Sequence, residues 1–206
     1  MAPKAPGFQV RATGTPGAFA FSGGGMAEQL PTARYRALID AAARLVGLPR
    51  WESSAPGAWL EALILNESSG NPRAMRYEAH QDRAGRADAS SDGDQPGVDD
   101  GFLEDDRSYG LMQVMGSNIR RLVGVPPGTP LRFEWSLLPL ANLSLGLRVL
   151  VAELATTGGD VDRALARYNG GPTGDDVGAG GEMRCAGYVR RVRCALDKVE
   201  QDRSLA

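Results

Sequence analysis

Residues 56–74 read PGAWLEALILNESSGNPRA, an apolar run that ends in polar and glycine-containing sequence. Pro56 suits the first turn of a helix, where its missing N–H group is not needed. The pattern therefore predicts a helix that begins near Pro56 and ends around Ser68. Its last turn carries Glu67. Three apolar residues lie on or beside the face of that glutamate at helical spacing: Leu60, Leu63 and Ile64.

The position of Glu67 favours a protonated carboxyl group. A carboxyl group held against apolar side chains loses hydration, and at a helix C-terminus it gains no support from the helix dipole. Both effects raise the pKa of such a group, which suits a general acid that works near neutral pH. A solvated glutamate at a helix end is the commoner alternative, so other parts of the sequence must decide between the two.

Three further segments carry polar side chains beside glycine-containing helix ends. Residues 108–113 read SYGLMQ, residues 164–172 read ALARYNGGP, and residues 187–192 read GYVRRV. Their amide and phenol groups can hydrogen-bond the hydroxyl and N-acetyl groups of a sugar. Taken singly, residues such as Met112 and Tyr168 are more often core residues than ligand contacts.

Together and in this order, the four segments resemble the lytic transglycosylase family, of the soluble lytic transglycosylase and goose-type lysozyme-like kind. Members show Glu-Ser followed by Asn-Pro and Ala, then Gly-Leu-Met-Gln, then Ala-x-x-Tyr-Asn-x-Gly, then Tyr-Val. The corresponding stretches here are residues 67–74, 110–113, 166–171 and 188–189. In the third stretch one residue, rather than two, separates the alanine from the tyrosine. The segment with Asn142 and Gly146 also fits the family, and the resemblance covers roughly residues 35–200.

The resemblance implies a lysozyme-like α fold, a peptidoglycan substrate and Glu67 as the sole catalytic carboxylate. In the implied mechanism, Glu67 protonates the glycosidic oxygen between N-acetylmuramic acid and N-acetylglucosamine. It then takes the proton of the muramyl C6 hydroxyl, which closes a 1,6-anhydro ring. The candidate substrate contacts are Ser68, Glu78, Met112, Gln113, Tyr168, Asn169 and Tyr188.

The chain departs from the family pattern after the catalytic glutamate. Many members carry a serine about nine residues later, where this chain has Arg76, followed closely by Glu78. A second carboxylate at Glu78 could activate water, and the enzyme would then be a lysozyme-type muramidase. We favour a structural ion pair of Glu78 with Arg73 or Arg76. A third alternative is a non-catalytic virion or wall-binding protein that retains the fold, against which the intact motifs argue.

The sequence predicts a mainly α protein of about six helices, with a small hairpin and a long acidic loop. We divide it into an extended Gly/Pro-rich arm, residues 1–30, and a lysozyme-like domain, residues 31–206, with an acidic insert at about 78–107. Besides the helix that carries Glu67, periodicity predicts helices over residues 32–46, 109–122, 134–156 with a bend at Pro139, 160–168, and about 188–199. The first and the last of these helices each have one apolar face that we expect to pack in the core, and Leu45 belongs to the face of the first. Thr32 and Asp160 are the expected N-caps.

Composition places the chain among globular proteins that do not bind nucleic acid. It has 206 residues, 42% hydrophobic and 23% charged, with a net charge of -2. We find no stretch approaching the roughly 18 apolar residues of a membrane span. Residues 1–25 lack an apolar signal core. We therefore expect action on the bacterial wall or periplasm by a phage-encoded protein, either an endolysin or a virion-associated lysin docked on tail proteins through the arm.

Metal and disulfide chemistry is sparse. One histidine and two cysteines exclude the usual four-ligand His/Cys metal site. Part of the acidic insert matches several positions of an EF-hand calcium loop, but we prefer a solvated loop and expect no cofactor. The candidate Ca²⁺ ligands are Asp88, Ser90, Asp92, Asp94 and Asp99. On one continuous helix, Cys185 and Cys194 would be roughly 13 Å apart, which is too far for a disulfide. We expect Cys185 to precede the last helix and fold back, and in that case the two cysteines form a disulfide.

Overall fold

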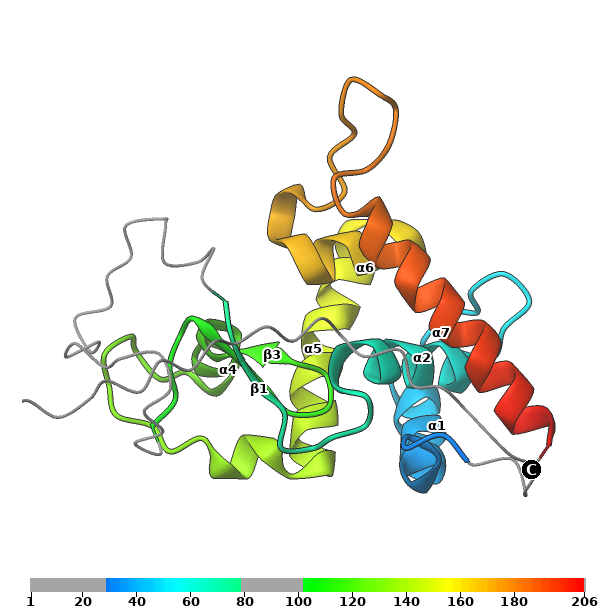
Figure 1. Cartoon of the computed structure of the whole chain (residues 1–206). Coiled ribbons are helices and arrows are strands. Elements are labelled where there is room, and N and C mark those ends of the chain that lie inside the picture. Colours follow the sequence, from blue (N-terminus) through cyan, green and yellow to red (C-terminus); the bar gives the residue numbers. More distant parts are fainter. Residues whose placement is uncertain (1–28, 79–101, 206) are drawn as a thin grey trace, which may run out of the picture.

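The computed structural model describes residues 29–78 and 102–205, and the described part is mainly helical, as predicted (Figure 1). Its α-helices are α1 (Arg36–Leu45), α2 (Pro56–Ser68), α4 (Gly116–Val123), α5 (Pro139–Thr156), α6 (Val161–Gly170) and α7 (Ala186–Ser204). The 3-10 helices are η1 (Ala33–Tyr35), η2 (Glu134–Leu137) and η3 (Gly171–Thr173). The strands β1 (Met75–Tyr77), β2 (Arg107–Tyr109) and β3 (Val114–Met115) form an antiparallel sheet in that order.

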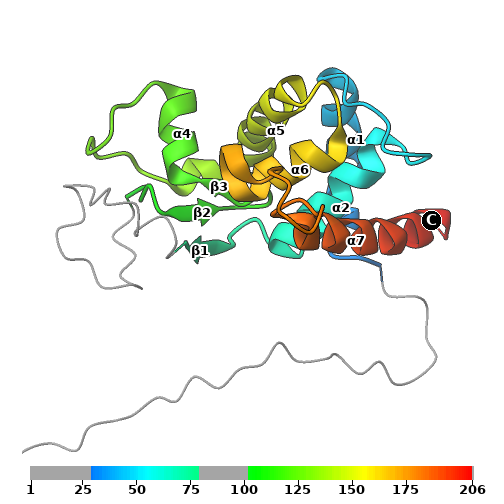
Figure 2. The ribbon, with the colours of Figure 1, turned by 90° about the horizontal axis from the view of Figure 1, so that it is seen from above.

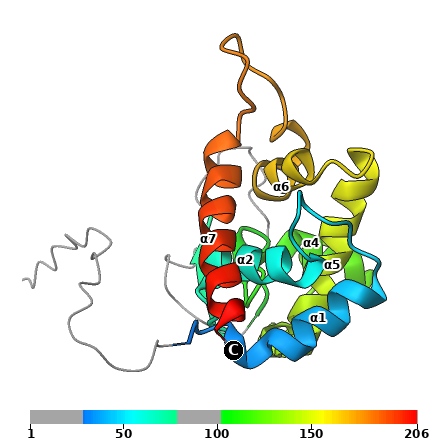
Figure 3. The same ribbon diagram turned by 90° about the vertical axis from the view of Figure 1, so that its right-hand side faces the viewer.

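Helix α2 is buried on every side. All eight residues from 57 to 64 are buried, so the helix shows no polar face over this stretch. Helices α7 and α1 pack against it, and Figure 3 shows α7 running across α2. Pro56 occupies the first turn, and the left-handed backbone at Ser69 ends the helix. Both predicted ends of this helix are confirmed.

The sheet lies at the end of the molecule away from α1 and α7. Seen from above, the three strands and α4 lie at one end, α1 and α7 lie at the other, and α5 and α6 lie between them (Figure 2). In the register of β1 and β2, Arg76 lies opposite Ser108. The sheet confirms the small hairpin expected from the sequence. Strand β1 follows α2 after a short turn, so the sheet begins close to the C-terminal end of α2.

The helix predicted over residues 109–122 is wrong in its first half. Gly110 and Gln113 have left-handed backbone angles, φ 75° and 46°, which no helix accommodates. The buried Asn142 side chain takes the backbone groups instead. Its Oδ1 accepts from Met112 N at 2.8 Å, and its Nδ2 donates to Tyr109 O at 2.8 Å. The helix therefore begins only at Gly116.

Helix α5 begins at a break where the sequence suggested a bend. Pro139 is its first residue, and the extended Leu138 separates it from η2. By length and composition alone, the 18 residues of α5 could cross a membrane, contrary to our expectation that no such stretch exists. Eight of them are buried in the domain, and a buried core helix can have the same length and composition.

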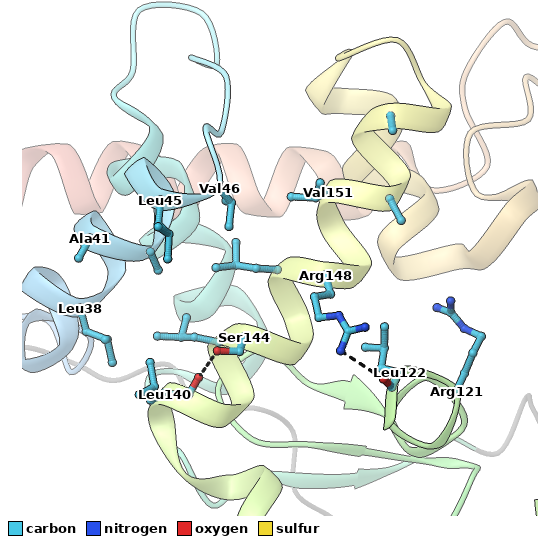
Figure 4. A pocket seen from close by; sticks show the side chains of 15 residues that line it. Leu38, Ala41, Leu45, Val46, Arg121, Leu122, Leu140, Ser144, Arg148 and Val151 are labelled. Atoms are coloured by element: carbon cyan, nitrogen blue, oxygen red, sulfur yellow. Dashed lines mark hydrogen bonds between the residues drawn. The ribbon is translucent and has the colours of Figure 1, made fainter. Parts of the chain in front are cut away.

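Helix α1 differs from its prediction at both ends. A short 3-10 turn precedes it, and Thr32 makes no capping bond with its side chain. Leu45, which we expected in the core, is 87% exposed. It lines an apolar pocket of about 740 Å³ between α1, α4 and α5 (Figure 4). Arg121 and Arg148 belong to the same lining.

The last two helices follow the sequence closely. The Asp160 side chain caps α6 by accepting from Arg163 N at 3.1 Å, as predicted. Helix α7 buries one face, which the sequence also predicted. Its buried residues include Tyr188, Val189, Val192, Leu196 and Val199.

The arm and the acidic insert fall mostly outside the described residues, which exclude 1–28 and 79–101. All candidate Ca²⁺ ligands lie in the second of these segments. Within the described ranges, no three acidic, histidine or cysteine side chains cluster as a metal site would require.

A buried ionic cluster ties α2 to its neighbours. The fully buried carboxylate of Glu61 accepts from Thr32 Oγ1 at 2.9 Å, from Arg36 Nε at 3.1 Å and Nη2 at 3.0 Å, and from Arg203 Nε at 2.8 Å. This hydrogen-bonding raises the pKa of Arg36. Arg203 also pairs with Asp40 at 2.9 Å, so one cluster joins α1, α2 and α7. Both oxygens of the Glu61 carboxylate therefore accept two hydrogen bonds each, and such complete pairing is the condition under which a buried charge is tolerated.

Glu61→Ala should lower the free energy of unfolding by about 3 kcal/mol, because two guanidinium groups would lose a buried partner. Urea denaturation followed by circular dichroism measures this. Glu134→Gln is the matched control, since Glu134 forms an exposed pair with Arg132 and its loss should leave stability nearly unchanged. Equal effects of the two variants would contradict a structural role for the Glu61 cluster.

Candidate active site

Glu67 lies in the last turn of α2 with its side chain almost completely removed from solvent, at 6% exposure. The Tyr188 hydroxyl, from the first turn of α7, donates a hydrogen bond to its Oε1. Because α2 and α7 pack together, two segments 121 residues apart meet at one carboxyl oxygen.

Burial raises the pKa of Glu67, and this is the largest influence on it. The hydrogen bond from Tyr188 and the charges of Arg76 and Arg191 act in the opposite direction, and the nearby charge of Glu78 adds to the increase. The carboxyl group is therefore biased towards its protonated form. This is the state that a general acid needs at the start of a reaction.

The two tyrosines near Glu67 stay neutral phenols. Burial raises the pKa of Tyr168 and of Tyr188 well above the usual value, and the charge of Glu67 raises both further. Tyr168 donates its hydroxyl hydrogen to Met112 O at 2.7 Å. Tyr168 thus joins α6 to the segment 110–113 beside the acid, so this segment belongs to the site.

The side chains of Gln113 and Met112 are buried and stabilise the backbone around the site. Both Nε2 hydrogens of Gln113 are used, by Ala74 O at 3.1 Å and Gly110 O at 2.9 Å, and its Oε1 lies 2.9 Å from Ser108 Oγ as acceptor. Met112 is fully buried and packs where Gly146 leaves room, since a Cβ on Gly146 would come within 2.4 Å of the methionine sulfur. In the described structure these two side chains hold backbone segments together.

The remaining predicted contacts differ in exposure. Ser68 bonds back to its own helix, from Oγ to Ile64 O at 3.2 Å. Asn169 is exposed at the end of α6. Tyr188 is buried, and Glu78 lies within reach of the Arg76 guanidinium. The geometry brings Glu67, Tyr168 and Tyr188 together, while a sugar-binding role for each predicted contact stays a prediction.

Three residues of the site were missed as participants by sequence reasoning. Arg76 donates from Nε to Glu78 Oε1 at 2.7 Å and places Nη2 3.8 Å from Glu67 Oε2. Ser108 Oγ lies 3.1 Å from Glu78 Oε1. The Arg191 guanidinium lies over the Tyr188 ring at 5.6 Å. The structural ion pair predicted for Glu78 is confirmed, with Arg76 as its partner.

The expected disulfide is wrong, because both cysteines are free thiols. Cys185 does precede α7, but its sulfur faces α6, 3.5 Å from Asn169 Nδ2. Cys194 lies on the exposed side of α7, more than two turns along the helix. The two side chains therefore belong to different surroundings.

Tyr188→Phe should raise the pKa of Glu67, since the hydrogen bond it removes stabilises the ionised carboxylate. Carbon-detected NMR titration of the glutamate side-chain carboxyl groups measures the change. Tyr168→Phe serves as the control, because its hydroxyl group bonds Met112 O rather than the acid. An unchanged Glu67 titration in Tyr188→Phe would show that the hydrogen bond contributes nothing to the ionised form.

Comparison with known proteins agrees with this fold. The fold resembles the X-ray structure of an inactive mutant of the lytic transglycosylase Slt from Pseudomonas aeruginosa, with a TM-score of 0.53 and 19% identity over 85% of this chain. The chain spans 25% of that structure's length, and at this identity the likeness shows the fold alone. No curated protein matches significantly. The model of the transglycosylase SLT domain matches residues 49–177, well over half of the chain, and the chain therefore belongs to the transglycosylase SLT domain family.

Proposed function

We propose that this chain is a peptidoglycan lytic transglycosylase, which cleaves the β-1,4 bond between N-acetylmuramic acid and N-acetylglucosamine. Family membership supports the reaction class. The observation that carries the proposal is the buried carboxyl group of Glu67, whose pKa is raised by burial and whose Oε1 accepts from Tyr188. An acid of this kind can protonate the oxygen of a leaving sugar.

The proposed reaction uses Glu67 twice. Its proton passes to the glycosidic oxygen as the bond to the muramyl C1 breaks, and the N-acetyl carbonyl of the substrate stabilises the positive charge at C1. The ionised Glu67 then takes the proton of the muramyl C6 hydroxyl, whose oxygen bonds to C1. No water is consumed, and the acid returns to its starting state. The attacking hydroxyl is already part of the substrate, which gives it a high effective concentration.

The surroundings of Glu78 favour ring closure over hydrolysis. A hydrolase of the inverting kind needs a second carboxylate that activates water. Glu78 pairs with Arg76 at 2.7 Å and lies within hydrogen-bond distance of Ser108. Its negative charge is therefore already matched by a guanidinium group. The muramidase alternative remains the second candidate because Glu78 is close enough to Glu67 to raise its pKa.

The delivery route predicted from residues 1–30, as a phage endolysin or a virion-associated lysin, stays a prediction. Residues 1–28 lie outside the described part of the chain. The bacterial origin of the substrate is common to both routes, so the proposed chemistry does not depend on the choice between them.

The products should carry 1,6-anhydro-muramyl ends, because the attacking oxygen comes from the same sugar. Mass spectrometry of digested peptidoglycan distinguishes them, since an anhydro end is lighter by one water than a reducing end. Borohydride reduction is the control, because it modifies reducing ends only. Reducing-end products that disappear in Glu78→Gln would instead support the muramidase alternative.

Glu67→Gln should reduce cleavage on the order of 10²–10⁴-fold, since an amide can neither donate nor reclaim the proton. Release of soluble muropeptides from purified peptidoglycan measures the rate. Glu182→Gln, which alters an exposed pair with Arg190, should keep full activity. Glu78→Gln should cost less than Glu67→Gln, in line with a positioning role. A fully active Glu67→Gln protein would refute the mechanism.

A further inference from the structure

Arg76 lies between two carboxyl groups at unequal distances. Its Nε is hydrogen-bonded to Glu78 Oε1 at 2.7 Å, while its Nη2 is 3.8 Å from Glu67 Oε2, beyond hydrogen-bond distance. The Arg76 side chain is 55% exposed, whereas those of Glu78 and Glu67 are 16% and 6% exposed. The guanidinium group is thus the exposed member of this trio.

Of the two paired ions, Glu78 and Arg76, Glu78 is held more firmly in place. Its backbone N–H donates to Asp106 O at 2.8 Å, which ties it to the segment leading into β2. Ser108, opposite Arg76 in the sheet register, places its hydroxyl 3.1 Å from the Glu78 carboxylate. Arg76 has a long side chain with room on its solvent side, so a shift of its Nη2 towards Glu67 requires no movement of the sheet.

The charge of Glu67 changes during the proposed reaction, while that of Glu78 does not. Before the first step Glu67 is protonated and attracts a cation only weakly. Between the two steps it is an anion, and an ion pair over a few ångströms in a poorly solvated site is then favourable. Arg76 can therefore pair with Glu78 alone while Glu67 is protonated, and with both carboxylates while Glu67 is ionised.

We propose that Arg76 is a movable counter-charge, held by Glu78 while Glu67 carries its proton and turning towards Glu67 once that proton has passed to the substrate. Glu78 is then a positioning residue that keeps Arg76 off the acid before the reaction. This inference rests on the proposed function, in which Glu67 alternates between the two states. With Glu78 neutral, Arg76 would retain Glu67 as its carboxylate partner within 4 Å among the described residues.

Other charged and titratable groups also face Glu67. Tyr188 and Arg191 reach it from α7, and Tyr168 feels its charge from α6. Changes at residues 76 and 78 leave those three side chains in place. Burial raises the pKa of Glu67 in every variant, so differences between variants report on Arg76 and Glu78 alone.

The experiment compares Glu78→Gln, Arg76→Gln and the matched control Arg73→Gln in the full chain. Arg73 is exposed, lies on the same segment and carries the same charge. NMR titration of the Glu67 carboxyl group should give a lower pKa in Glu78→Gln, because Arg76 then stabilises the anion. It should give a higher pKa in Arg76→Gln, because that stabilisation is lost. Arg73→Gln should match the wild type.

Cleavage should follow the same signs. In kcat/KM, the fall in rate at high pH should move to lower pH in Glu78→Gln and to higher pH in Arg76→Gln, and Glu78→Gln should lose roughly tenfold at neutral pH. High salt should restore part of the loss in Glu78→Gln, because an exposed guanidinium group is screened. A merely structural role would lower the rate without moving the two profiles in opposite directions.

Two fixed charges would also shift the Glu67 pKa in opposite directions, but their effects would be additive. A fall in the Glu67 pKa on Glu78→Gln that is clearly larger with Arg76 present than in the Arg76→Gln background supports the proposal. Additive shifts, shifts of the same sign, or none beyond Arg73→Gln overturn it. Thermal melts establish that each variant is folded. If Glu78→Gln is unfolded, Arg76→Lys replaces it, and its Glu67 pKa should fall between those of wild type and Arg76→Gln. The NMR measurement needs no turnover. If the wild-type protein leaves peptidoglycan intact while the variants show the expected shifts of the Glu67 pKa, the proposed function alone is refuted.

Discussion

The rest of the structure depends on the burial of helix α2 over residues 57–64. A helix without a polar face can be placed only between other elements, and the carboxylate of Glu61 fixes where. Its bonds to Arg36 and Arg203 join α1, α2 and α7 through a charge that has no access to water. Breaking any of these contacts would leave the buried charge of Glu61 less completely matched, which favours the arrangement of the three helices that keeps all of them. Because Glu67 lies on the same helix, its position is set by that cluster.

Helix α7 connects stability with chemistry. Near its end it supplies Arg203 to Glu61, and near its start it supplies Tyr188 to Glu67. The packing of α7 against α2 removes the acid from water, which raises its pKa, while the Tyr188 hydroxyl bonds the ionised form, which lowers it. The proton affinity of Glu67 is therefore a balance of two effects of one helix contact. A shift of α7 would alter both effects at the same time.

Sequence reasoning succeeded where local pattern and tertiary contact agree. The ends of α2, the Asp160 cap and the buried face of α7 all follow from periodicity and capping chemistry. It failed at residues 110–113, because a left-handed Gln113 and the backbone bonds of Asn142 depend on a contact 30 residues away. Leu45 looked like a core residue because periodicity shows which face is apolar and cannot show whether a neighbour covers it. Glu67 was identified from its apolar surroundings and the family motifs, whereas Arg76 was expected as a partner of Glu78 and not as a neighbour of Glu67.

The position of Arg76 beside Glu67 could not be predicted from the sequence because it depends on strand pairing. Residues 76 and 78 are two apart in an extended segment, so their side chains lie on the same side of it, and pairing with β2 adds Ser108. The turn after α2 brings that edge of the sheet beside Glu67. A lone arginine there would oppose a protonated acid, and a lone glutamate would supply an unmatched base. Together they leave the net charge near Glu67 unchanged while keeping a cation within 4 Å of it. An acid that must lose and regain a proton gains from such a neighbour, because the counter-charge can respond to the acid's own ionisation.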